Sequence, residues 1–87
     1  MPRFFFNLVD GERERDEVGI ELPDLGAARL QAVRYAGELF KDQPEELWAK
    51  GQWRVEVTNK AGALFCTVIT LAIDAPTPEQ QAGNDAS

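Results

Sequence analysis

Seven carboxylates near the start of the chain are the residues whose type best suits them to chemistry. They lie between positions 10 and 24: Asp10, Glu12, Glu14, Asp16, Glu17, Glu21 and Asp24. Converging carboxylates can hold a hard cation, and a pair of them can act as general acid and base. Their spacing does not match a calcium loop, and so short a chain offers no evident cleft. We therefore interpret Asp10 and Asp16 as turn residues, Asp24 as a helix cap and the glutamates as solvated.

The cysteine and histidine content of the chain does not favour catalysis. Cys66 is the single cysteine and follows Phe65 in an apolar run, whereas a reactive thiol needs exposure and nearby positive charge. The chain has no histidine, which excludes Ser-His-Asp and Cys-His nucleophiles and histidine-based zinc sites. We expect a protein that is not an enzyme, with no cofactor and no bound metal.

Charge and hydropathy exclude two classes of binding partner. Fifteen acidic residues against nine basic ones give a net charge of −6, and the basic residues are scattered. This is not the footprint of a nucleic-acid-binding protein, so Phe4, Phe5 and Phe6 are interpreted as core rather than as base-stacking residues. No apolar run approaches the ~20 residues of a membrane span. The N-terminus lacks a signal-peptide cleavage pattern, and one cysteine cannot form an internal disulfide. We expect a cytoplasmic location, without nucleic-acid or membrane partners.

One stretch is long and periodic enough to predict a helix, from Asp24 to about Lys41. At 100° per residue its apolar side collects Leu25, Ala28, Ala32, Tyr35, Ala36, Leu39 and Phe40. Arg29 projects near the middle of that stripe, and Leu30 points away from it. Leu30, Val33 and Gly37 form a second, smaller apolar strip, which either packs on the following segment or contacts another protein.

Short strands surround this helix. Residues 2–9 and 63–73 are apolar on both faces, which predicts two covered strands, with 63–73 the most central. Residues 12–17 are all charged and predict an exposed edge strand or loop, and Ile20-Glu21-Leu22 alternates apolar and polar residues. Residues 44–50 predict a short helix that tucks Leu47 and Trp48 against the core, and residues 53–58 alternate as a strand.

The predicted fold class is α+β, in the order β-β-α-(short α)-β-β. A four-stranded, mainly antiparallel sheet would carry the long helix on one face. Residues 1–73 form a single domain, and residues 74–87, rich in Pro, Gln, Gly, Asn and Asp, predict a disordered acidic tail.

Several motifs taken together resemble a known family. They are the opening Met-Pro-Arg-Phe-Phe-Phe, the Asp10-Gly11 turn, Asp16-x-x-Gly19-x-Glu21-Leu22-Pro23-Asp24, the Ala28/Ala32 spacing and Trp53-Arg54-Val55-Glu56-Val57. They are similar, over roughly residues 1 to 72, to a domain-of-unknown-function family of short, mostly alphaproteobacterial proteins that open Met-Pro-Arg-Tyr/Phe-Phe-Phe. This chain has Phe4 where Tyr is common. The resemblance implies a compact α+β domain and assigns no functional residue.

A looser likeness concerns small antitoxin domains of the HicB type. The strand-turn-strand, the Pro-Asp-Leu step and the Ala-rich helix are similar to theirs. Such proteins commonly carry a separate DNA-binding element, for which this chain has no room. The likeness implies an alternative function, a regulatory domain that binds a partner enzyme.

Counting apolar faces leads to the main functional prediction. One helix covers one sheet face, yet the first and last strands are apolar on both, and monomers rarely expose large apolar patches. We predict a two-fold homodimer, with contacts among Phe5, Val9, Arg29, Leu30, Val68, Ile69 and Leu71. Alternatively, the short helix and the charged hairpin fold over the second face. The expected function is a non-enzymatic, self-associating protein-interaction module, and an open strand edge would let it bind a protein or peptide as well.

Overall fold

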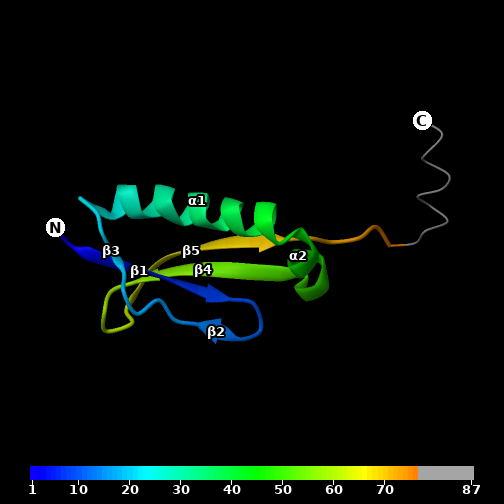
Figure 1. Cartoon of the computed structure of the whole chain (residues 1–87), viewed down its shortest axis with the longest axis horizontal. Coiled ribbons are helices and arrows are strands. Elements are labelled where there is room, and N and C mark those ends of the chain that lie inside the picture. The colour runs from blue at the N-terminus through cyan, green and yellow to red at the C-terminus, as the bar shows by residue number, and fades with distance from the viewer. Residues whose placement is uncertain (77–87) are drawn as a thin grey trace.

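The computed structural model describes residues 1–76 as an antiparallel sheet with a long helix lying along one face (Figure 1). The elements are β1 (Arg3–Val9), β2 (Arg13–Glu14), β3 (Ile20–Glu21), α1 (Leu25–Asp42), α2 (Pro44–Lys50), β4 (Gln52–Thr58) and β5 (Leu64–Leu71). The α+β class is confirmed. There are five strands rather than four, because the charged arm supplies only the two-residue β2 and β3 follows separately. Of the predicted tail 74–87, residues 77–87 lie outside the described part.

The order of the sheet is β2-β1-β4-β5, with β3 paired to the start of β1. β1 is therefore central, as its three consecutive phenylalanines predict. Among residues 1–76, β5 pairs only with β4 and forms one edge of the sheet, so the prediction that it is the most central strand is wrong. A strand that is apolar on both faces is usually covered on both, and here part of that apolar surface remains open.

The core lies between α1 and the sheet. Ala28, Ala32 and Ala36 are fully or almost fully buried on β-strand side chains that include Val55 and Val57. Alanines let the helix lie close to the sheet, since each adds only a methyl group between the two layers. The predicted helix is confirmed to within about a residue at each end. Its predicted cap is also confirmed, because Asp24 Oδ1 accepts from the Ala27 N–H at 2.8 Å.

The short helix α2 follows α1 after a break at Gln43, whose N–H donates to the Leu39 carbonyl. Pro44 occupies its first turn, where a missing N–H costs nothing, and Gly51 ends it with φ of +82°. Leu47 is half-buried, whereas Trp48 is 58% exposed, so the prediction that both side chains tuck against the core is wrong for Trp48. A helix of two turns can turn only part of its surface toward its neighbours.

Candidate functional site

The segment between β2 and β3 is fastened to β1 by the side chain of Asp16. Its Oδ2 accepts from the Phe6 N–H at 3.2 Å, and its Oδ1 accepts from the N–H groups of Val18 and Gly19, both at 3.0 Å. β2 pairs with the end of β1 and β3 with its beginning, so within the described part of the chain the middle of β1 has no strand partner on that edge. The carboxylate of Asp16 replaces the missing strand there.

The electrostatics of Asp16 follow from these contacts. Burial on its own would raise the pKa of the Asp16 carboxyl. Hydrogen bonds from the backbone N–H groups of Gly19, Phe6 and Val18, together with the charge of Arg3, act in the opposite direction. The net result is a pKa lowered from the ordinary value of 3.8, so the group stays ionised.

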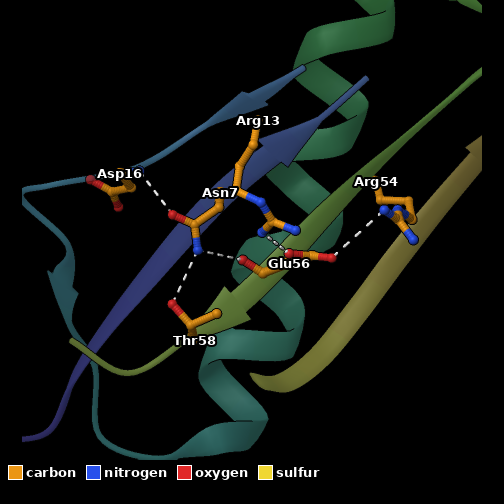
Figure 2. Close-up of polar contacts among 6 residues, drawn as sticks. All are labelled: Asn7, Arg13, Asp16, Arg54, Glu56 and Thr58. Carbon is orange, nitrogen blue, oxygen red and sulfur yellow. Dashed lines mark hydrogen bonds and ion pairs between the residues drawn. The ribbon is translucent and has the colours of Figure 1, made fainter. Parts of the chain in front are cut away.

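Asn7 links this segment to β4 on the sheet face away from α1. Its Oδ1 accepts from the Asp16 N–H at 2.9 Å, and its Nδ2 donates to Thr58 Oγ1 at 3.1 Å and to the Glu56 carbonyl at 3.3 Å (Figure 2). Asn7 is only 6% exposed, and a buried amide needs hydrogen-bond partners within the protein because water cannot supply them. The centre of this second face is therefore polar.

Ion pairs continue the polar surface beyond Asn7. Glu56 Oε1 accepts from Arg13 Nη1 of β2, and Glu56 Oε2 lies 3.9 Å from Arg54 Nη2 (Figure 2). Arg13 belongs to β2, whereas Glu56 and Arg54 both belong to β4. Because β1 lies between these two strands in the sheet, the Arg13–Glu56 pair reaches across β1 and ties β2 to β4 on the face that α1 leaves uncovered.

Gly19 closes this face over Phe5. It has φ of +74°, and a Cβ built on it would lie 2.9 Å from Phe5 Cε2, 2.8 Å from Arg3 Cγ and 3.0 Å from the Phe4 carbonyl oxygen. Only glycine fits so close an approach. Phe5 is 6% exposed as a result. Phe5 is therefore covered by the charged hairpin segment of the same chain, which is the alternative that the sequence offered to cover by a second copy.

A surface pocket of about 310 Å³ lies between this segment and the turn that joins β4 to β5. Its buried members are Phe5, Asn7 and Thr58. Around them lie Gly62 and six charged or polar residues from both sides: Arg13, Arg15, Asp16, Glu17, Asn59 and Lys60. The pocket brings three of the nine cations of the chain together.

The second notable surface is the free edge at β5. Residues 61–73, which include the whole strand, contain no charged residue and no proline. The exposed apolar side chains of the strand are Leu64, Phe65, Ile69 and Leu71, the last two 57% and 58% exposed. Natural proteins usually protect such edges with lysine, proline or a covering loop.

The α1 surface beside this edge is also apolar. α1 lies over β4 and β5. The flank of α1 that carries Gln31 and Tyr35 faces the β1 side, where it lines a pocket together with Phe6 and Ile20. The flank carrying Val33 and Phe40 must therefore lie toward the free edge of β5. Both side chains are exposed. We call Val33, Phe40, Leu64, Phe65, Ile69 and Leu71 the β5-edge surface.

The structure distributes the predicted contact residues over several places. Ile69 and Leu71 lie on the β5-edge surface, and Arg29 and Leu30 are exposed on α1. Phe5 is buried beneath Gly19, Val9 is half-buried, and Val68 packs against the core. The interface candidates therefore do not form one patch.

Sequence reasoning missed the Asn7–Asp16 connection and three members of the β5-edge surface, Phe40, Leu64 and Phe65. Phe40 was predicted on the core side of the helix but is 44% exposed. An asparagine inside a phenylalanine-rich strand was the available signal for the first, because such a buried amide requires partners. The face of the strand on which Phe65 lies could not be predicted, because a register shift at Val57/Thr58 changes it. In the structure the Phe65 ring meets the Phe4 ring edge-on, with centroids 5.6 Å apart.

The carboxylates of residues 10–24 serve separate roles. Glu21 pairs with Arg3 at 3.0 Å, Asp24 caps α1, and Asp10 accepts from the Glu12 N–H at 3.4 Å. Within residues 1–76, no three His, Cys, Asp or Glu side chains gather closely enough to hold a metal ion. In the same part of the chain, no helix has the length and hydropathy needed to cross a membrane.

Comparison with known protein families places the chain in one of them. The model of a family described as "Domain of unknown function (DUF6894)" matches residues 3–72. The matched region runs from the first residue of β1 to just past the end of β5, so it contains the whole sheet and both helices. No curated protein and no solved structure gives a significant match.

Proposed function

We propose, from the premise that the chain belongs to the DUF6894 family, that it is a non-enzymatic protein-interaction module that self-associates through its β5-edge surface. The observation that carries the proposal is a free edge strand of eight residues without a single charge, flanked by exposed apolar side chains on both sides. Such an edge offers backbone hydrogen bonds as well as apolar contact to an added strand.

The partner that fits best is a second copy. An antiparallel pairing of β5 with β5 about a two-fold axis uses the same surface on both copies, which a closed dimer requires. Each chain carries a net charge of −6, so two copies repel one another over most of their surface. The uncharged β5 edge is where this repulsion is weakest and apolar contact is greatest.

The available area is of the right size. The six side chains of the β5-edge surface are each about half exposed. With on the order of 150–200 Å² per large side chain, they offer roughly 500 Å² per copy and roughly 1,000 Å² for a pair. The backbone of the paired edges adds to this, which brings the interface toward the ~1,200–2,000 Å² of specific complexes.

The chain's own chemistry supports a role without catalysis. It has no histidine, and Cys66, its only cysteine, is half-buried opposite Val57. Both features favour a binding function over a nucleophilic one. A lone cysteine is also typical of the reducing cytoplasm, which is the location that we propose.

Sedimentation velocity tests the proposal directly. We expect wild type to sediment at twice the 9.7 kDa chain mass at micromolar concentration. The double variant Ile69→Lys/Leu71→Lys should be monomeric, because it places like charges opposite one another across the two-fold axis. Val18→Lys is the matched control, since Val18 is 76% exposed and lies in the turn before β3. A monomeric wild type, or a variant that dimerises as wild type does, contradicts the proposal.

The HicB-like alternative requires a partner enzyme in place of the second copy. The β5 edge could serve either partner, and no contact among residues 1–76 favours the enzyme. Purification from the native host separates the two. Self-association predicts the chain alone at twice its mass, whereas the antitoxin-like function predicts a second, different chain in fixed proportion.

A further inference from the structure

The pocket over Phe5, described above, presents an excess of hydrogen-bond donors. Asn59 Oδ1 accepts from the Ala63 N–H at 2.9 Å, which leaves the Asn59 amide N–H groups for another acceptor. Thr58 Oγ1 accepts from Asn7, and its hydroxyl proton has no acceptor within residues 1–76. Arg15 and Lys60 form no ion pair in the same part of the chain. These four groups all belong to the lining.

The acceptors of the lining other than Glu17 are already engaged. Both oxygens of Asp16 accept backbone N–H groups, and Asn7 Oδ1 accepts from the Asp16 N–H. Glu17 is exposed and is the one lining carboxylate with no hydrogen-bond partner among the described residues. A ligand that enters the pocket would therefore meet donors in the majority, and two of these are full cations.

The shape of the pocket adds an apolar contact. Phe5 contributes an aromatic ring at its buried end, beside Thr58. A volume of about 310 Å³ is at the lower end of the range for small-molecule sites. A ring or short aliphatic body that touches the part of Phe5 left uncovered by Gly19 would leave its polar end within reach of Arg15 and Lys60, which come from opposite walls.

We propose that this pocket binds a small organic anion, with an oxyanion held by Arg15 and Lys60 and an apolar body against Phe5. The oxyanion is a carboxylate or a phosphate ester, both of which accept hydrogen bonds from guanidinium and ammonium groups. The pocket lies at the β1–β4 centre and the β4–β5 turn. The proposal therefore does not depend on whether the β5-edge surface pairs with a second copy.

Amide chemical shifts of the 9.7 kDa chain give the test. The probes are benzoate and phenyl phosphate, with benzamidine as the cationic control and inorganic phosphate as the control without an apolar body. We expect both organic anions to shift the amides of Phe5, Thr58 and Asn59 with a dissociation constant on the order of millimolar, as usual for ligands of this size. Binding should weaken as salt is raised.

Two variants separate the pocket from general charge. Arg15→Ala/Lys60→Ala should weaken benzoate binding by about fivefold or more, since two charge contacts are lost. Arg34→Ala/Lys41→Ala removes the same charge from the exposed side of α1 and should bind as wild type does. Equal binding of benzamidine, equal binding of inorganic phosphate and phenyl phosphate, unchanged affinity in the first variant, or no shift with any probe overturns the proposal.

Discussion

Removing the carboxylate of Asp16 should release the segment that closes the middle of β1. Three backbone N–H groups lose their acceptor in Asp16→Ala, and the Phe6 N–H is the part-buried one. An orphaned buried N–H costs about 1–3 kcal/mol, and hydrogen bonds to a charged group contribute about 1.5–3 kcal/mol where water does not compete. Water can replace the acceptor at Val18 and Gly19. We therefore expect a loss of about 2–4 kcal/mol in the free energy of unfolding.

Asp16→Asn should cost less, about 1–2 kcal/mol, because its amide oxygen can keep the two turn N–H groups. Its NH₂ group then faces the Phe6 N–H, donor against donor. Urea denaturation followed by tryptophan fluorescence measures both values, at one fixed protein concentration because association shifts apparent stability. Glu17→Ala is the control and should stay within about 0.5 kcal/mol of wild type. If Asp16→Ala also stays within that range, the bridging role of Asp16 is refuted.

The same group predicts a pH dependence. The folded pKa of Asp16 lies below its ordinary value of 3.8, so the folded state favours the ionised form. The stabilisation is fully present above the unfolded pKa and is lost as the pH falls through the folded pKa. Wild type should therefore lose stability below about pH 4 more steeply than Asp16→Asn, which has no proton to take up. Parallel curves for the two proteins in acid would contradict this account.

Three further predictions concern stability. Gly19→Ala should cost about 1–3 kcal/mol of stability, because Gly19 has a positive φ and lies against β1. Gly11 has φ of +106° but no neighbour within 4 Å, so Gly11→Ala should cost only the conformational part. Equal losses in the two variants would contradict the role of the β1 contacts. Trp53 is 2% exposed, and its Nε1 has no hydrogen-bond partner among residues 1–76. In urea denaturation, Trp53→Phe should therefore cost less than about 1 kcal/mol, while Trp53→Ala costs about 3–5 kcal/mol. Burial, with the charges of Glu14 and Asp16, raises the pKa of Tyr35 above 10.0. The stability that the protonated Tyr35 contributes is therefore present below pH 10 and is lost as the pH rises through the folded pKa. Tyr35→Phe should remove this loss of stability at alkaline pH.

The helix and its cap could be predicted because their signals are local. Three alanines at helical spacing and an aspartate at the first turn determine one face and one end without reference to the rest of the chain. The α+β class follows from the strands on either side. These inferences depend on periodicity, which the sequence displays directly.

The position of β5 could not be predicted in the same way. Ile69 and Leu71 are apolar whether a neighbouring strand, another layer or a second chain covers them, and composition does not distinguish these cases. The side of the strand on which Phe65 lies could not be predicted for a related reason. A single register shift at Val57/Thr58 changes which side of the strand a residue faces, and no local pattern marks it.

The polar second face was also beyond sequence reasoning. Asn7 and Asp16 are nine residues apart, and Thr58 is far from both along the chain. Each is an ordinary turn or strand residue when taken alone. Their hydrogen bonds arise only once β1 has paired with β4, so the count of apolar faces overestimated the surface that a second copy must cover.

Amide hydrogen exchange along β5 is the most direct measurement of the central claim. Self-association through this edge predicts that β5 amides not paired with β4 exchange slowly in concentrated wild type and faster on dilution. They should also exchange faster in Ile69→Lys/Leu71→Lys at every concentration. The amides of β4, paired on both sides within the chain, should change little. Exchange along β5 that is independent of concentration, or protection that develops on another surface, would contradict the account.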